Sequence, residues 1–224
     1  MHHRLRADAT RVLVHAARAR GVARFVKESV TFTDRDGGDR WLDESVPLVD
    51  LPVWRSTLEG ERLVAGLTAD GGCGVVLRFG ALYAPGARST DEYRRLVRLH
   101  LSPVIGPRDA YVSSTHAHDA ATAIHAALAA PPGVYNVVDD EPLTRRDYAA
   151  AVGRAFGAGR LWPMPTAPMR LLAGDAVRQM AASQRVGNRA FVAATGWRPR
   201  WGDARRGWAA IAAPGGPDVA VASR

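Results

Sequence analysis

The sequence predicts an α/β fold in which helices flank a parallel sheet, and three observations support this class. Segments with helical and with strand character alternate along the chain. Residues 73–79 read Cys-Gly-Val-Val-Leu-Arg-Phe, a nearly continuous apolar run that is typical of a strand buried on both faces. The composition, 47% hydrophobic and 23% charged, is that of a folded domain.

The first element predicted is a helix over residues 5–20. Its apolar side chains recur at intervals of three and four, at Leu5, Ala9, Val12, Leu13, Ala16 and Ala17. Gly21 is a suitable stop for this helix. A strand is predicted over 24–32, where β-branched and aromatic residues are dense.

The later elements follow from the same signals. Gly/Asp composition predicts a loop at 34–39, and the apolar run predicts a strand at 73–79. Helical spacing predicts a helix from Val53 to Leu67, with Leu58, Leu63 and Val64 facing inward. Further helices are predicted over 116–130 and 145–156, and a short strand over 134–138.

Composition and charge exclude several classes. The formal net charge is +8, but the arginines are scattered along the chain rather than clustered, so we expect no nucleic-acid partner. The one cysteine, Cys73, excludes an intramolecular disulfide. No apolar run is long enough to span a membrane and the N-terminus does not read as a signal peptide, so we expect a cytoplasmic protein with no membrane partner.

Seven short motifs resemble, in the same order, those of the NAD(P)-dependent epimerase/dehydratase family of extended short-chain dehydrogenases/reductases. They lie at Val22–Val26, Leu42–Leu48, Arg55–Arg62, Val76–Gly86, His116–Asp119, Gly133–Pro142 and Gly196–Pro199. Among them are Val-Leu-Arg-Phe-Gly-Ala-Leu-Tyr-Ala-Pro-Gly, which resembles "LRPGNVYGPG", and Gly-Trp-Arg-Pro, which resembles "GW-x-P".

The resemblance implies a Rossmann-like parallel sheet that lacks the N-terminal dinucleotide-phosphate unit and carries a small C-terminal substrate lobe. We expect a partial Rossmann-like domain at 1–139, the substrate lobe at 140–212 and a flexible tail at 213–224. By resemblance the cofactor is NAD or NADP and the substrate is a small molecule. The family also implies a homodimer formed through the helices at 5–20 and 53–67.

Departures from the family pattern bear directly on activity. The chain has no Gly-x-x-Gly-x-x-Gly motif, which in this family binds the dinucleotide pyrophosphate. The catalytic Tyr and Lys positions fall on Val53 and Thr57, and the Ser/Thr position falls on Val30. We therefore expect cofactor binding by this chain alone to be impaired.

The remaining site candidates come from polar residues near the ends of predicted strands. Catalytic candidates are Ser29, Thr31 and Tyr83, and substrate-binding candidates are Glu28, Arg78, Tyr83 and His116. A structural alternative stands beside each reading. Ser29 then caps or turns the chain, Arg78 pairs with a carboxylate, Tyr83 packs in the core, and Asp119 caps the helix that follows. His116 and His118 lack a third spaced ligand, so we predict no metal site.

Two functions remain open at this point. One is an NAD(P)-dependent epimerase/dehydratase-like oxidoreductase, represented here by an N-terminally shortened chain. The other is a non-catalytic or cofactor-independent relative that binds a small ligand or a protein partner in the residual pocket. In either case the strand near Phe25–Phe32 is expected to have an open edge. The Trp residues of 197–208 are expected to pack in the C-terminal lobe, and the Arg residues between them are not expected to bind nucleic acid.

Overall fold

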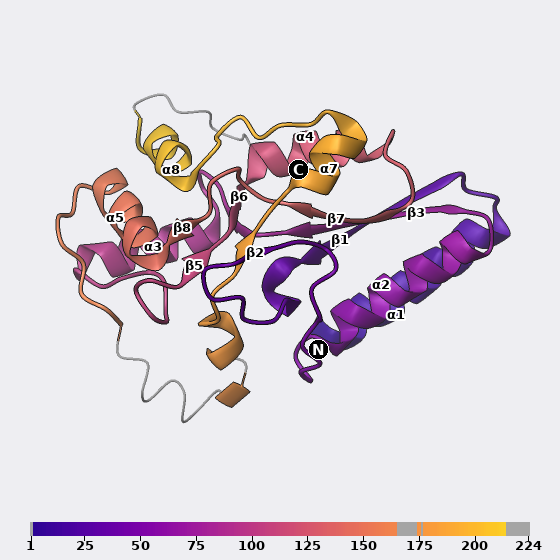
Figure 1. The fold of residues 1–224 in the computed structure, drawn as a ribbon, viewed down its shortest axis with the longest axis horizontal. Coiled ribbons are helices and arrows are strands. Elements are labelled where there is room, and N and C mark those ends of the chain that lie inside the picture. The colour runs from indigo at the N-terminus through magenta and orange to yellow at the C-terminus, as the bar shows by residue number, and fades with distance from the viewer. Residues whose placement is uncertain (1, 165–173, 176, 214–224) are drawn as a thin grey trace.

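The computed structural model describes residues 2–164, 174–175 and 177–213, and its centre is a three-stranded parallel sheet (Figure 1). The strands are β1 (Arg24–Val30), β3 (Cys73–Phe79) and β7 (Gly133–Val137), in the order β1-β3-β7. Residues 24–30 pair in register with 73–79, and 75–79 pair with 133–137. The predicted α/β class with a parallel sheet is confirmed.

Helices cover both faces of this sheet. Helices α1 (His2–Ala19) and α2 (Arg55–Ala69) lie on one face, and α4 (Ala117–Ala127) and α7 (Arg189–Thr195) lie on the other (Figure 1). In β3, Val75, Leu77 and Phe79 pack in the core toward α4 and α7, while Val76 packs with Val64 toward α2. Because alternate side chains of β3 enter two different cores, the strand reads as one apolar run.

Most of the apolar stripe predicted on the first helix faces solvent. Between residues 7 and 19, the part of α1 whose burial is described, Ala7, Thr10, Val14 and Ala17 are buried, whereas Ala9, Val12, Leu13 and Ala16 are exposed. Val12 and Leu13 are 66% and 57% exposed. The helix therefore carries two apolar faces, one against α2 and one toward solvent, and spacing alone could not rank them.

Several element boundaries differ from the predicted ones. β1 ends at Val30 because Thr31–Thr33 forms a 3-10 turn, in which the Asp34 N–H donates to the Thr31 carbonyl. α2 begins at Arg55 rather than 53, and α4 spans 117–127 rather than 116–130. β3 spans the predicted residues 73–79. Most of the predicted tail, residues 214–224, lies outside the described residues.

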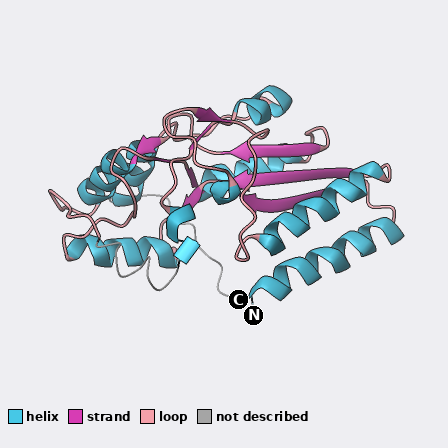
Figure 2. Ribbon diagram, turned by 60° about the horizontal axis from the view of Figure 1, so that its bottom comes forward, coloured by secondary structure: helices cyan, strands magenta, loops and turns pink. Residues whose placement is uncertain are grey.

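Beside the sheet, short strands and three helices form what we call the lobe (Figure 2). Its elements are α3 (Arg88–Arg98), β5 (Tyr111–Val112), β8 (Leu143–Thr144), α5 (Arg145–Ala155) and α8 (Ala204–Ala212). Trp208, Tyr148 and Leu143 are at its core, together with Val97 from α3. Residues from both sides of position 140 thus build this core. Three strand pairs complete the fold, namely β4 (Ala81–Tyr83) with β6 (Ser114–His116), β5 with β8, and β2 (Trp41–Leu42) with β9 (Arg185–Val186).

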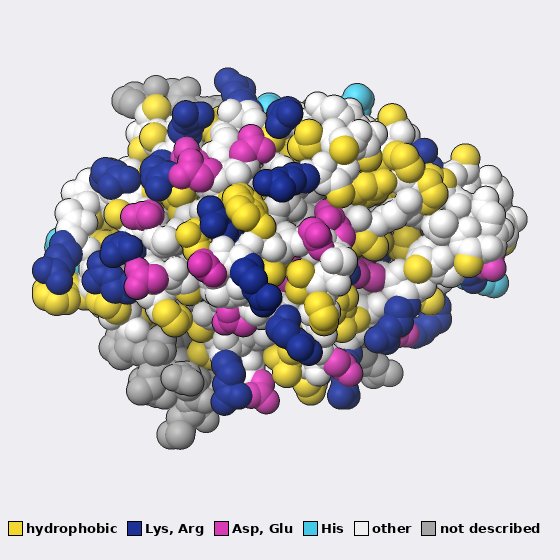
Figure 3. Space-filling model, in the orientation of Figure 1, with side chains coloured by type: hydrophobic (Ala, Val, Ile, Leu, Met, Phe, Trp, Pro, Cys, Tyr) yellow, Lys and Arg dark blue, Asp and Glu magenta, His cyan; other side chains and the backbone are white. Residues whose placement is uncertain are grey.

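Two surface features matter for function. Among the strands that the structure describes, β1 pairs only with β3, so its other edge is open. On the face seen in Figure 3, basic side chains are interspersed with acidic ones and form no continuous stripe. Within the described residues, no helix is both long and apolar enough to cross a membrane.

Candidate functional site

A buried polar network links β1, α2 and β3. The Ser29 hydroxyl donates to Glu61 Oε1 at 2.5 Å. Arg78 binds the same carboxylate with two nitrogens, Nε to Oε1 at 3.0 Å and Nη2 to Oε2 at 2.6 Å. All three side chains are buried. A bidentate pair of this kind fixes both partners, and it occupies most of the hydrogen-bonding capacity of the Glu61 carboxylate.

Asp34 extends this network but is bound more loosely. Its side chain is 0% exposed, and Oδ1 lies 3.9 Å from Arg78 Nη1, too far for a hydrogen bond. Its backbone carbonyl accepts from the side-chain amides of Gln179 and Gln184, each at 2.7 Å. Burial raises the pKa of Asp34 to about 7, although the nearby Arg78 charge opposes the shift. Asp34 is therefore a buried carboxyl that exchanges its proton near neutral pH.

The positions of the family's acid–base residues carry no titratable group. Thr57 is buried in the first turn of α2, and its hydroxyl has no hydrogen-bond partner among the described residues. Val53 and Val30 are half-buried. A valine cannot donate a proton, and a threonine hydroxyl cannot supply the positive charge of a lysine. Proton transfer through a Tyr/Lys pair is therefore not available at these positions.

A second cluster, of aromatic rings and histidine, lies where β4 and β6 meet α8. The Tyr83 ring stacks on Trp208 at 4.8 Å between centroids and meets His116 edge-on at 5.2 Å. The His116 ring lies 4.0 Å from that of Trp201. Burial lowers the pKa of His116 to about 4, so the ring is neutral near pH 7. Its Nδ1 accepts from the His118 N–H at 3.1 Å, which caps α4.

The predicted capping role of Asp119 was wrong, because His116 occupies the cap position. The Asp119 carboxylate instead accepts from the backbone N–H groups of Arg200, at 2.8 Å, and Trp201, at 3.4 Å. It therefore ties the loop before α8 to the start of α4. All three tryptophans expected to pack are buried, but only Trp208 lies in the lobe core, whereas Trp197 packs in the sheet core and Trp201 packs against His116.

The structure brings some of the predicted site residues together and separates others. Ser29 and Arg78 meet through Glu61, and Tyr83 contacts His116. Ser29 lies within β1 and caps nothing. Thr31 is buried in the 3-10 turn, and its carbonyl accepts from Gln184 Nε2. Glu28 is exposed on β1, the edge strand of the sheet.

Sequence reasoning missed Glu61 and Asp34. Glu61 was detectable, because it lies four and eight residues after Thr57 and Val53 and therefore on the same side of the helical stretch. Asp34 was not detectable, because a Gly/Asp-rich loop predicts exposure and its burial depends on two glutamines about 150 residues away in the chain. No group of three or more His, Cys, Asp or Glu residues that could hold a metal ion occurs in the part of the chain that the structure describes.

Comparison with known proteins defines the class to which this architecture belongs. No family model matches the chain. A 3-diazoavenalumate denitrifying reductase from a Streptomyces species is 35% identical over 208 residues, which are 88% of this chain and 67% of the relative. A human epimerase family protein crystallised with NADPH superimposes with a TM-score of 0.77 at 23% identity, over 92% of this chain and 72% of that one. A Thermus thermophilus UDP-glucose 4-epimerase complex with NAD gives a TM-score of 0.68 at 21% identity, over 89% and 66% of the two chains.

The fold and these comparisons define a Rossmann-type α/β protein of the short-chain dehydrogenase/reductase class. More particularly, the chain belongs to the NAD(P)-dependent epimerase/dehydratase family. It spans about two thirds of the length of the Streptomyces relative. The predicted family is confirmed.

The described residues lack several features with which the family holds its dinucleotide. Solved neighbours contain NADPH or NAD, so the family cofactor is NAD(P). In this chain, however, no Gly-x-x-Gly-x-x-Gly turn is present to receive a pyrophosphate, and the strand edge of β1 has no neighbour on its outer side among the described strands. Val53 and Thr57 also offer no charged group toward a ribose.

Proposed function

We propose that this chain is a reductase-type member of the family whose 224 residues contribute the substrate side of the fold and do not by themselves hold NAD(P) tightly. One observation carries the proposal: Val53 and Thr57 stand where the family has its Tyr and Lys, and the Thr57 hydroxyl is buried without a partner among the described residues. The absence of a glycine-rich phosphate turn from the sequence supports it.

Calorimetric titration of the full chain with NAD, NADH, NADP and NADPH tests this proposal. We expect dissociation constants weaker than about 1 mM, because neither a phosphate cradle nor a ribose-binding lysine is present. A constant in the low micromolar range would contradict it. The double variant Val53→Tyr/Thr57→Lys is the matched comparison, and it should improve binding if the rest of the pocket is intact.

A second candidate function is reductive removal of a diazo group, and the similarity to the Streptomyces reductase favours it. When hydride replaces a diazonium group on carbon, the C–N bond breaks and N2 leaves with the bonding electrons, R–N2⁺ + H⁻ → R–H + N2. No alkoxide forms, so this reaction needs no phenol to donate a proton. A protein with Val53 in place of tyrosine is chemically compatible with it.

Incubation with an aryl diazonium carboxylate and NADPH, with N2 release followed by mass spectrometry, tests this second candidate. Release above that of NADPH with heat-inactivated protein would support it. If N2 release equals this control while the titration shows no tight NAD(P) binding, the second candidate is wrong and the first stands.

We also propose that the chain forms a homodimer through α1 and α2. The exposed apolar face of α1, formed by Ala9, Val12, Leu13 and Ala16, supports this, because such a stripe gains stability when a second copy covers it. The buried face of the same helix already packs on α2, so the exposed face is available to a partner.

We place the protein in the cytoplasm. Its single cysteine, Cys73, is a free thiol at the start of β3, as is usual for proteins of reducing compartments. Cell fractionation with an antibody to the chain tests this, and recovery in a secreted fraction would contradict it.

A further inference from the structure

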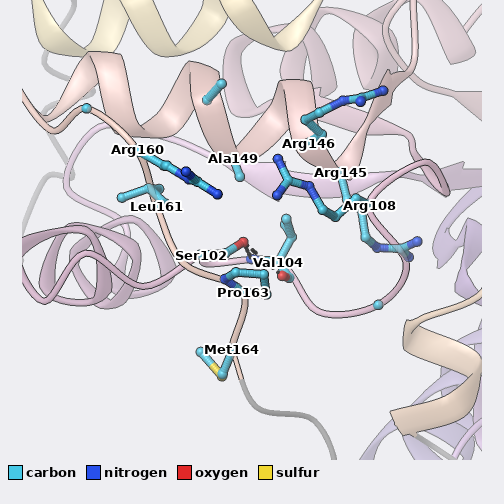
Figure 4. Close-up of a pocket in the computed structure, with 13 residues that line it drawn as sticks. Ser102, Val104, Arg108, Arg145, Arg146, Ala149, Arg160, Leu161, Pro163 and Met164 are labelled. Atoms are coloured by element: carbon cyan, nitrogen blue, oxygen red, sulfur yellow. Dashed lines mark hydrogen bonds between the residues drawn. The ribbon is translucent and has the colours of Figure 1, made fainter.

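The lobe contains a cavity of about 140 Å³ that is lined by four arginines (Figure 4). They are Arg108, Arg145, Arg146 and Arg160, and no aspartate or glutamate is among the lining residues. Val104, Ala149, Leu161, Pro163 and Met164 provide apolar wall. A volume of this size accommodates a group as large as a benzene ring.

The four guanidinium groups are not equivalent. Figure 4 shows Arg145 and Arg160 directed toward each other across the cavity, whereas Arg108 and Arg146 point outward at its rim. Arg146 is already paired with Asp109 at 2.9 Å. Arg160 is exposed, and its guanidinium carbon lies 4.9 Å from the centroid of the Trp162 ring. Arg145 and Arg160 are therefore the two groups placed to bind something inside the cavity.

Arg145 is a buried cation whose hydrogen bonding is incomplete. Arg145 is 6% exposed. Nη2 donates to the carbonyls of Met180, at 2.9 Å, and Ala182, at 2.8 Å. Within the described part of the chain, Nη1 is buried without a hydrogen-bond partner, and no carboxylate forms an ion pair with this guanidinium. Burial lowers the pKa of Arg145 to about 10, although the charge of Asp36, which forms no ion pair with it, opposes the shift; Arg145 therefore remains charged at neutral pH.

Such an arrangement costs free energy unless an anion completes it. A buried charge without a counter-ion, and a buried donor without an acceptor, both destabilise a fold. The adjacent N-terminus of α5 adds positive potential, but its first N–H groups are already used by the carbonyls of Ala110 and Arg108 and by the Thr144 hydroxyl. Recognition of an anion here would therefore fall to the guanidinium groups.

We propose that this cavity binds the oxyanion group of a small molecule, a carboxylate or a phosphate, between Arg145 and Arg160. One oxygen accepts from the free Nη1 of Arg145, and the exposed Arg160 closes on the anion from the opposite side. The apolar wall around Ala149 and Leu161 receives the uncharged part of the ligand.

Calorimetric titration of the full chain with pyrophosphate and, separately, with benzoate tests the proposal and distinguishes the two sources of the oxyanion. We expect at least one of them to bind with a dissociation constant below about 1 mM, and Arg160→Gln to weaken binding at least about tenfold, because a charge-assisted hydrogen bond is lost. Arg145→Lys keeps the positive charge but loses the planar guanidinium group with its fixed N–H donors, and it should also weaken binding.

Arg154→Gln is the matched control. Arg154 is exposed in the last turn of α5 and does not line the cavity, so this variant changes the net charge equally and should leave binding within about twofold. Far-ultraviolet circular dichroism of each variant checks the fold, and Arg160→Gln keeps the test decisive if Arg145→Lys does not fold. Failure of both anions to bind below about 10 mM, or equal loss in Arg154→Gln, would overturn the proposal.

Discussion

The sheet half and the lobe of this protein differ in the partners of their buried arginines. In the sheet half, formed by β1, β3 and β7 with their flanking helices, Arg78 is neutralised by Glu61 and supported by Ser29. In the lobe, Arg145 is equally buried but has only backbone carbonyls as partners among the described residues. The two buried arginines therefore differ in whether a carboxylate contacts them, and the anion site proposed for the lobe rests on that difference.

At the outer surface, the sheet half leaves more apolar and backbone groups exposed than the lobe does. The sheet half has an open strand edge at β1 and an exposed apolar stripe on α1. The lobe encloses its aromatic residues, and Trp208 and Tyr148 are buried at its core. The sheet half therefore exposes a strand edge and apolar side chains at its surface, whereas the lobe encloses its large aromatic residues.

Breaking the closed network should have the largest effect. Glu61→Gln removes the charge that compensates buried Arg78 and should lower the free energy of unfolding by about 4 kcal/mol, the range for removing one partner of a buried pair. Urea denaturation followed by circular dichroism measures this. Glu59→Gln, on the same helix and in an exposed pair with Arg11, is the control and should change stability little. Equal midpoints for the two variants would mean that the network contributes nothing to stability.

The buried carboxyl of Asp34 predicts a pH dependence confined to the sheet half. Its pKa is about 7 in the fold and 3.8 in a model peptide, so between these values the folded state binds the extra proton. Raising the pH through this window therefore favours unfolding, by an amount on the order of 4 kcal/mol. Asp34→Asn has no proton to lose there, and its stability should not show this decline.

Urea midpoints of wild type and Asp34→Asn at about pH 4.5, 6 and 7.5 measure the difference between the two curves. Other titrating groups, such as His116, are common to both proteins and cancel in that difference. Parallel curves would show that Asp34 ionises in the folded protein as it does in water.

How much of this comparison could be predicted from the sequence depends on how far apart in the chain the contacting residues lie. Both ends of β3 were predicted to the residue, because its seven residues form a nearly continuous apolar run, which is typical of a buried strand. The side of α1 that faces inward was not, because Val12 and Val14 are both apolar and only packing against α2 decides between them. Arg145 could not be recognised as an unpaired buried cation, since its partners are carbonyls of residues 180 and 182, which carry no side-chain signal.

The exposed stripe of α1 predicts a change in assembly. If a second copy covers it, light scattering of the wild type at micromolar concentration should give about twice the chain mass of 24.0 kDa. Leu13→Glu places a charge in that contact and should yield the monomer. Ile124→Glu, at an exposed apolar position on α4, is the control and should remain dimeric. A wild type that is already a monomer at micromolar concentration would show that this interface does not form.

The smallest effect is expected at the open edge of the sheet, and hydrogen exchange measures it. β3 is paired on both sides, whereas β1 is paired on one, so the N–H groups of β1 that point away from β3 have no strand partner among the described residues. Peptides covering Arg24–Val30 should exchange at least about tenfold faster than those covering Cys73–Phe79, because edge amides open more readily. Raising the protein concentration sharpens the comparison, since strand pairing between chains would protect β1 selectively. Equal protection of the two strands in a dilute monomer would mean that another segment already covers this edge. The contrast between the exposed strand edge of the sheet half and the enclosed aromatic core of the lobe would then fail.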